Sequence, residues 1–301
     1  MKSRNIVNLV LFIGVLTLVV FLMLDTGENN EPAKPKLTQL NSDNLSYIEI
    51  TRPDLRNVVL EKINNRWHLT QPFSMPASKF RIEALVKLLS ADVQSSHTLD
   101  PLRLKDYALD KPKGTITFNH KVKLEFGNTD PIKNRRYIKQ GNTLNLVADT
   151  FYYLTRSLAT EFVDEQLLPQ DKTITAISLP DLRISLKDNK WTIAPEPENF
   201  VSDTVAEFVN EWQNSQAMDI KEYVADSKQP LKNDITITLD KNGLTEKISY
   251  AIINSKDEFI LVRQDHGLQY IFPASQKQNL LALPAAIEAD DKPTNTTNDS
   301  K

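Results

Sequence analysis

The chain has 301 residues, of which only 7 are Gly and none is Cys, and its formal net charge is −3. Average Gly usage is about 7%, and the glycines here are spaced too widely for a dinucleotide-binding loop, a phosphate-binding loop or a G-x-S-x-G nucleophile elbow. The lack of Cys excludes disulfides, thiolate-bound zinc, iron–sulfur clusters and thiol catalysis. The slightly acidic balance gives little support to nucleic-acid binding. We expect no nucleic-acid partner and no cofactor.

Residues 6–24 form an apolar segment without a charged side chain, IVNLVLFIGVLTLVVFLML. A helix of this length would be about 28 Å long, close to the thickness of the hydrocarbon core of a bilayer. The segment therefore predicts a transmembrane helix. Lys2 and Arg4 precede it and acidic residues follow it, so the positive-inside rule places residues 1–5 in the cytoplasm and the rest of the chain across the membrane.

A cleaved signal peptide is the alternative for the same segment. Its apolar stretch is longer than the usual 7–15 residues, and the sequence Leu22-Met23-Leu24 offers no small-x-small cleavage site. We therefore favour an uncleaved signal anchor.

Two polar segments flank the remaining body. Residues 25–44 begin with a polar stretch containing Pro and are expected to be a linker. Residues 288–301 contain no large apolar residue and are expected to be a disordered tail.

The body between these segments contains an internal repeat. Pro53–Arg56 reads PDLR, and Pro180–Arg183 reads the same. Trp67 and Trp191 follow the two copies at similar distances, and each Trp is followed by a Pro-containing break. These matches predict a duplicated body with a first repeat at 45–170 and a second at 171–287.

Each repeat is expected to contain several strands and one amphipathic helix. Apolar residues at helical spacing begin after Ser78 and after Ser202, and each Ser can serve as an N-cap. A shorter closing helix is expected at Phe151–Leu158. Period-2 alternation predicts the strands, which are Ser46–Thr51, Val58–Ile63, Arg66–Leu69, Thr115–Phe118, Lys121–Phe126, Arg136–Lys139 and Leu144–Val147, then Ala176–Leu179, Arg183–Leu186, Lys190–Ile193, Ile235–Leu239, Glu246–Ile253, Glu258–Arg263 and Gln269–Phe272.

Strands and helices do not alternate one for one, so a doubly wound parallel sheet is not expected. The predicted fold class is α+β. An N-terminal transmembrane helix precedes two tandem, internally duplicated and mostly antiparallel α+β repeats.

Four segments carry a resemblance to a known family. They are Trp67–Ala77 (WHLTQPFSMPA), Tyr107–Pro112 (YALDKP), Leu124–Gly127 (LEFG) and Tyr137-Ile138. Together they resemble the DUF4340 family of bacterial membrane-anchored proteins of unassigned function, over about residues 45–290 and most strongly over 58–170.

The family usually has Gly where Ala108 stands, which affects a turn. The resemblance implies a single-pass protein of the bacterial inner membrane with its body in the periplasm. Some members accompany genes for ABC transporters or gliding machinery, which implies a membrane or periplasmic protein partner. It supplies no catalytic residues.

Two sets of residues are candidates for particular roles. Lys133, Arg135 and Arg136 form a basic run between two strands, which is either a solvated turn or a contact for lipid phosphates or an acidic partner. Trp67 and Trp191 occupy matching places in the two repeats, which favours structural anchors in the core over a ligand platform.

No other constellation indicates chemistry. The four His residues lack metal-binding spacing, and the neighbours Asp164 and Glu165 lack the pattern of a calcium loop, so a solvated face is favoured. Ser95, Ser96 and His97 are adjacent, and adjacent residues rarely face one another. We expect no catalytic, cofactor-binding or metal-binding residues, and no enzyme.

The leading hypothesis is a periplasmic interaction or scaffold module that is anchored in the inner membrane and accessory to a transporter or envelope complex. The alternative is a binding module for an envelope lipid or glycan, with its site in the cleft between the repeats. That alternative predicts an aromatic lining from residues such as Tyr152, Tyr153, Tyr223 and Phe259. An enzyme is the least favoured reading, since it needs polar groups that converge from both repeats.

Overall fold

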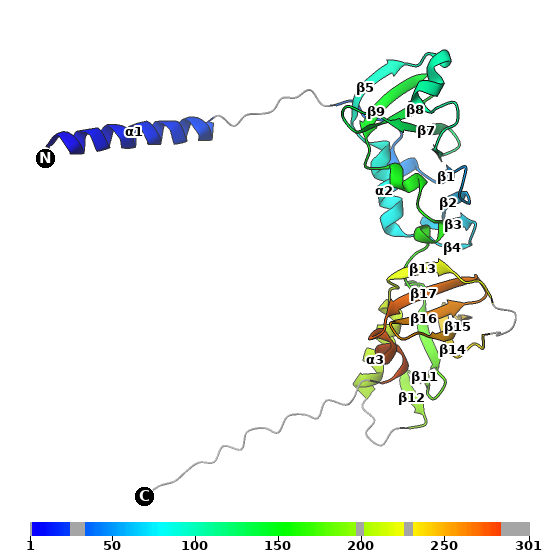
Figure 1. The fold of residues 1–301 in the computed structure, drawn as a ribbon. Coiled ribbons are helices and arrows are strands. Elements are labelled where there is room, and N and C mark those ends of the chain that lie inside the picture. The colour runs from blue at the N-terminus through cyan, green and yellow to red at the C-terminus, as the bar shows by residue number, and fades with distance from the viewer. Residues whose placement is uncertain (1, 25–33, 197–201, 226–230, 284–301) are drawn as a thin grey trace, which may run out of the picture.

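The computed structural model describes residues 2–24, 34–196, 202–225 and 231–283 (Figure 1). Its first element is helix α1 (Lys2–Leu24), which contains the apolar segment 6–24. Among the residues that the structure describes, no helix has both the length and the hydropathy needed to cross a membrane. The transmembrane segment stays a prediction. The predicted tail at 288–301 lies outside the described residues.

The first half of the body is a nine-stranded antiparallel sheet in the order β4-β3-β2-β1-β6-β7-β8-β9-β5. Its strands are β1 (Tyr47–Thr51), β2 (Val58–Ile63), β3 (Arg66–Gln71), β4 (Met75–Pro76), β5 (Val93–Thr98), β6 (Gly114–Phe118), β7 (Val122–Thr129), β8 (Arg135–Gln140) and β9 (Thr143–Ala148). Helix α2 (Lys79–Leu89) buries its apolar stripe, Ile82, Leu85 and Leu88, in the core. Short 3₁₀ helices are η1 (Ser42–Asn44), η2 (Pro101–Tyr107), η3 (Tyr152–Thr155) and η4 (Ala159–Phe162).

The second half is an eight-stranded antiparallel sheet in the order β12-β11-β10-β14-β15-β16-β17-β13. Its strands are β10 (Thr173–Ser178), β11 (Arg183–Lys187), β12 (Lys190–Ala194), β13 (Asp219–Glu222), β14 (Ile235–Lys241), β15 (Leu244–Asn254), β16 (Glu258–Arg263) and β17 (Leu268–Pro273). Helix α3 (Ser202–Asn214) contacts the short helix α4 (Gln276–Leu281). The two helices are joined by a hydrogen bond from the indole N–H of Trp212 to the carbonyl of Leu280, 3.0 Å.

The two sheets have the same strand order once β4 is set aside. In each half the first three strands form a meander, four later strands continue the sheet beside the first, and a helix precedes the strand at the far edge. The meanders also share a turn: Asn64 and Asn65 in the first, and Asp188 and Asn189 in the second, all have positive φ. Asn and Asp tolerate this backbone region, which two-residue hairpins need because its twist matches that of the strands.

All strands predicted from alternation are present, and the body is mostly β with some helix. Two expectations are corrected. In place of the closing helix expected at Phe151–Leu158 there is only the short 3₁₀ helix η3, and η4 follows after residue 158. The linker expected through residue 44 is shorter, because Leu37 and Leu45 are buried in the core and the N–H of Leu37 bonds the carbonyl of Ala91 at 2.9 Å.

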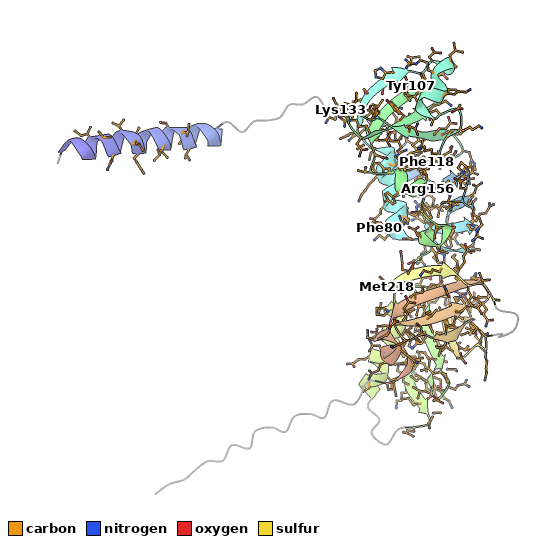
Figure 2. All side chains as sticks on the ribbon, in the orientation of Figure 1. Phe80, Tyr107, Phe118, Lys133, Arg156 and Met218 are labelled. Atoms are coloured by element: carbon orange, nitrogen blue, oxygen red, sulfur yellow. The ribbon has the colours of Figure 1, made fainter. Side chains whose placement is uncertain are left out.

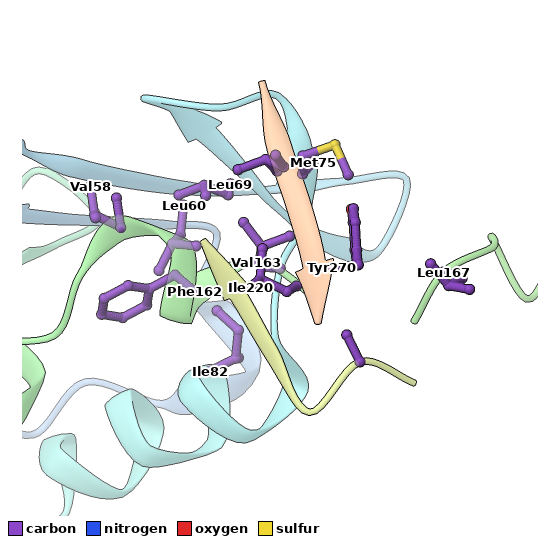
Figure 3. Packing of buried hydrophobic residues seen from close by; sticks show 14 of the residues in the cluster. Val58, Leu60, Leu69, Met75, Ile82, Phe162, Val163, Leu167, Ile220 and Tyr270 are labelled. Carbon is purple, nitrogen blue, oxygen red and sulfur yellow. The ribbon is translucent and has the colours of Figure 1, made fainter. Parts of the chain in front are cut away.

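The two halves share one hydrophobic core. Figure 3 shows Ile82, Phe162 and Val163 of the first half beside Ile220 and Tyr270 of the second, and all five belong to one cluster. Main-chain hydrogen bonds cross the junction as well: Ala217 donates to Glu165 at 2.8 Å and Leu167 donates to Ser215 at 3.0 Å. The junction is therefore packed like an interior, and the halves are not joined by the chain alone.

Candidate functional site

A cleft of about 1020 Å³ lies where the two sheets meet. The first half contributes the β2–β3 turn and the start of α2. Residues 164–172, here called the connecting segment, form its middle, and the second half contributes residues on β14, β15 and β16. Both halves are therefore needed to build it.

A three-residue charge bridge spans this cleft. Arg66 in the first half and Lys241 in the second both contact the same carboxylate oxygen, Oδ2 of Asp171, and the Arg66 Nη1 distance is 3.0 Å. The hydrogen bond from Lys241 lowers the pKa of Asp171 more than burial raises it, and Arg66 lowers it further. Asp171 thus stays ionised and holds the two hairpin ends together.

A second carboxylate of the connecting segment has the opposite character. Burial raises the pKa of Asp164, the neighbouring charge of Glu165 adds to the rise, and the backbone N–H of Gln166 opposes it. That N–H donates to Oδ1 of Asp164 at 3.2 Å. Asp164 lines the cleft but forms no salt bridge with a basic residue of the described chain. The surroundings of Asp164 therefore stabilise its ionised carboxylate only weakly.

Two buried tyrosines lie behind the connecting segment. The hydroxyl of Tyr250 donates to the carbonyl of Leu167 at 2.7 Å, and burial raises the pKa of Tyr250. Burial raises the pKa of Tyr270 to about 12. The hydroxyl of Tyr270 is buried and has no hydrogen-bond partner among the described residues. At the junction, the hydroxyl of Tyr250 therefore has a hydrogen-bond partner and the hydroxyl of Tyr270 has none among the described residues.

Arg263 and His266 complete the polar wall of the second half. Asp265 accepts from the Arg263 guanidinium at 2.7 Å and lies 3.3 Å from Nε2 of His266. Burial lowers the pKa of His266, and Arg263 lowers it further against the attraction of Asp265. The His–carboxylate contact is between neighbours in one turn, and in the described part of the chain no three His, Cys, Asp or Glu side chains group as metal ligands. The arrangement suits recognition of a polar ligand or surface.

The aromatic lining expected for the cleft is not observed. Phe259 is buried in the core, and the ring of Tyr152 lies 3.6 Å from the guanidinium carbon of Arg136, away from the cleft. Neither Tyr153 nor Tyr223 lines the cleft. Its aromatic residue is Trp67, at the start of β3.

The two tryptophans expected as core anchors are only half-buried. Trp67 and Trp191 pack against the edge of the core, whereas Trp212 on α3 is fully buried. Trp67 shares its strand face with the fully buried Leu69 but lies at the end of the sheet, where the core gives way to the cleft. The structural role of the two tryptophans stays a prediction, and their position at the edge of the core differs from the core position that was expected.

The basic run is divided by the fold. Lys133 is exposed in the β7–β8 turn, where Figure 2 labels it, and Arg135 is half-buried at the start of β8. Arg136 is 5% exposed and forms two bonds of 2.7 Å to Asp149 and one of 2.6 Å to the carbonyl of Gly127. Arg136 is therefore removed from the candidate interaction surface, because alternation along β8 turns it inward.

Sequence reasoning missed the residues of the charge bridge. Arg66 is more than one hundred residues before Asp171, and Lys241 is 70 residues after it. Neither pair has a sequence spacing that would indicate an ion pair. An isolated charged residue in a sequence is usually interpreted as solvent-exposed. The repeated motifs were the one sequence feature that could have pointed to this site, because they predict a junction near residue 170.

The fold and this site define a class: a body of two antiparallel sheets with a polar cleft between them. The family model described as "Domain of unknown function (DUF4340)" matches residues 67–241, more than half of the chain. The chain therefore belongs to this family, as the resemblance of its motifs predicted. The match runs from β3 to the end of β14, so it includes the start of α2 and the connecting segment, whereas the β2–β3 turn before Trp67 and the cleft residues on β15 and β16 lie outside it. Comparisons with curated proteins and with solved structures gave no match.

Proposed function

We propose that this chain is a single-pass inner-membrane protein whose periplasmic body is an interaction module, and that its partner, a protein of a transporter or envelope complex, binds in the cleft. The observation that carries the proposal is the cleft itself, which both halves and the connecting segment build. Its volume is at the upper end of the range for small-molecule pockets, and its wall is charged, as the rims of protein interfaces are. The apolar sequence of α1 supports the anchor.

Two charged residues at the mouth of the cleft are available to a partner. Lys79 and Glu83 are exposed at the start of α2, and neither is paired with an oppositely charged side chain in the part of the chain that the structure describes. Arg66 and Lys241 are already engaged by Asp171. Recognition would therefore use the α2 side of the cleft while the charge bridge keeps its shape.

We also infer that the two halves arose by duplication. The equal strand orders, the paired turns of Asn64-Asn65 and Asp188-Asn189 and the repeated PDLR sequence support this inference. A duplication explains why the cleft lies at a junction of similar units, where each unit contributes a hairpin end.

Site-directed photo-crosslinking in membranes tests the interaction module. A photoreactive residue in place of Lys79 or Glu83 should give one discrete crosslinked product in intact cells. The same residue in place of Lys121, exposed in the β6–β7 turn, is the control and should give none. Equal products from all three positions, or none from the cleft positions, would refute partner binding there.

The anchor and its orientation are tested separately. Because the chain has no Cys, a single Val224→Cys substitution supplies a unique thiol on the second half. A membrane-impermeant maleimide should label it in cells whose outer membrane is permeabilised, and alkaline carbonate should leave the chain in the membrane. Labelling only after lysis would indicate the opposite orientation, with the body in the cytoplasm.

A glycan of the envelope is the second candidate for the cleft. Trp67 is half-buried there, and amide side chains from the β2–β3 turn and the connecting segment line the same cleft, including Asn64, Asn65 and Gln166. A ring face beside amide donors and acceptors suits sugar hydroxyls. Thermal-shift measurements with envelope glycans should show stabilisation that Trp67→Ala abolishes and Trp191→Ala, the half-buried counterpart, preserves. No stabilisation by any glycan would remove this candidate.

A further inference from the structure

The end of the first sheet at which the chain enters the body also carries its exposed basic turn. The carbonyl of Pro35 accepts the N–H of Val93 at 2.8 Å, so the first described residues of the body lie beside the start of β5. Val93 stands opposite Val147 of β9, and Val147 stands opposite Arg136 of β8. Adjacent strands are about 4.8 Å apart. Three such steps place the start of β8 about 15 Å from the point where the chain enters.

The turn before β8 is closed by hydrogen bonds to Asp130. The carboxylate of Asp130 accepts the N–H groups of Ile132 at 3.4 Å and Lys133 at 3.2 Å, and its carbonyl accepts the N–H of Asn134 at 3.1 Å. Asn134 has a φ of 51°, which closes the turn. This arrangement leaves the Ile132 side chain 85% exposed. An apolar side chain is thus exposed on this turn.

The charge at this end is positive. Lys133 and Arg135 form no salt bridge with any acidic residue that the structure describes. The carboxylates nearby are already engaged: Asp92 by Lys36, Asp149 by Arg136 and Asp130 by its own turn. The exposed Lys133 and the half-buried Arg135 are therefore available to an external anion.

We propose that Ile132, Lys133 and Arg135, here called the basic rim, dock on anionic phospholipid headgroups of the membrane that holds the anchor. The proposal rests on the anchor of the proposed function. Ten residue steps join Leu24 to Lys34, and a chain of this length spans at most about 35 Å. The rim is close to that tether, and an exposed apolar side chain beside cations matches a bilayer interface, where both a surface potential and an apolar boundary are present.

The lack of Cys allows a direct test in the full chain. Ile132→Cys carries an environment-sensitive NBD fluorophore, and the protein is reconstituted into vesicles of phosphatidylcholine with or without phosphatidylglycerol. Val224→Cys is the matched control, because that side chain is also 85% exposed but lies after β13 in the second half. The label at 132 should shift to shorter wavelength and brighten only with phosphatidylglycerol, whereas the label at 224 should not respond.

The charge dependence gives a second readout. Lys133→Gln and Arg135→Gln should each lower the ratio of docked to free rim roughly fivefold, and about 1 M salt should suppress docking because the Debye length falls to about 3 Å. Equal emission at 132 in both lipids would overturn the proposal. A response only in native membranes would assign the rim to an acidic membrane protein and would also overturn it.

The proposal of a membrane anchor and the proposal of the basic rim can be refuted separately. If alkaline carbonate extracts the chain, the proposed function is overturned, and the label at 132 mixed with added vesicles still reports whether the rim binds anionic lipid. A chain that resists carbonate but shows no lipid-dependent signal at 132 overturns the rim alone.

Discussion

Arg136 belongs to a basic run in the sequence but serves the interior of the first half. Its guanidinium pairs with Asp149, bonds the carbonyl of Gly127 and lies 3.6 Å from the ring centre of Tyr152. A planar, delocalised cation can satisfy a carboxylate, a carbonyl and an aromatic face together. The neighbouring Arg135 points the other way along the strand, so two adjacent arginines have different roles.

Arg136→Ala should therefore destabilise the chain, while Arg135→Ala should not. Removing one partner of a buried ion pair leaves the other uncompensated, which costs about 3 kcal/mol, whereas a surface substitution that breaks no such pair changes stability by about 0.5 kcal/mol or less. Urea unfolding followed by circular dichroism measures both. Equal effects of the two substitutions would contradict the separate roles.

The tryptophans give a second comparison between single side chains. Trp212 is fully buried and its N–H is bonded, whereas Trp67 is half-buried at the cleft. Trp212→Ala should cost about 3–5 kcal/mol, as for a core aromatic residue, and Trp67→Ala should cost clearly less. Urea unfolding of the two variants decides it. A larger loss for Trp67→Ala would show that the cleft wall is the more important packing site.

At the scale of elements, the connecting segment places two carboxylates in opposite situations. Asp171 accepts from two cations and has a lowered pKa, whereas Asp164 is partly buried without a basic partner and has a raised pKa. A group whose pKa is lowered by folding stabilises the folded chain above its unfolded pKa, and a group whose pKa is raised does so only below it.

Substituting each carboxylate by its amide should separate the two effects. At pH 7, Asp171→Asn should lower the free energy of unfolding and Asp164→Asn should raise it, since Asn can still accept the N–H of Gln166. The difference for Asp164→Asn should shrink as the pH falls from the raised folded pKa to the unfolded pKa of Asp, about 4, whereas the difference for Asp171→Asn should shrink only below about 4. Urea unfolding at pH 7 and pH 3 measures them. Changes of the same sign at pH 7 would refute the assignment.

Alternation predicts the strands that face the core and misses those that do not. β5 reads VQSSHT and β13 reads DIKE, and both are polar strands at sheet edges. They form by pairing with β9 and β17, which are distant in sequence. β4, of two residues, is too short for any periodicity. Edge strands of this kind depend on partners that local patterns do not contain.

One family motif gains a physical explanation at this scale. The Tyr107–Pro112 segment packs beside β7, where a Cβ on Gly127 would collide with the carbonyl oxygen of Tyr107. Ala108, where the family usually has Gly, has a positive φ of 53°. The motif therefore specifies a close backbone approach and a left-handed turn, and the sequence signalled the turn but not the approach.

At the scale of the molecule, the shared core decides how the halves behave. Ile82 and Phe162 pack into the same cluster as Ile220 and Tyr270, so opening the junction would expose apolar surface. The repeated motifs of the sequence predicted two units and a boundary near residue 170. It could not predict the cleft, because the cleft depends on how the units pack.

The body should therefore unfold in one cooperative transition. Tryptophan fluorescence and far-ultraviolet circular dichroism should give coincident urea curves, the mark of two-state behaviour. Leu167→Ala, in the connecting segment and buried at the junction, should lower the midpoint of both curves together. Two separated transitions in the parent chain would show that the halves fold independently.

The hydrogen bonds of Leu167 determine how the chain would behave if it were cut into two fragments near residue 170. Its N–H bonds Ser215 and its carbonyl accepts the hydroxyl of Tyr250, so a residue that follows the first sheet is bound by the second. A fragment that ends after residue 170 should carry an exposed apolar end, and the fragment that begins there should lack the connecting segment, whose Leu167 carbonyl accepts the Tyr250 hydroxyl. Either fragment alone should aggregate, but the two produced together should reassemble as a split protein whose signal reports the closed junction.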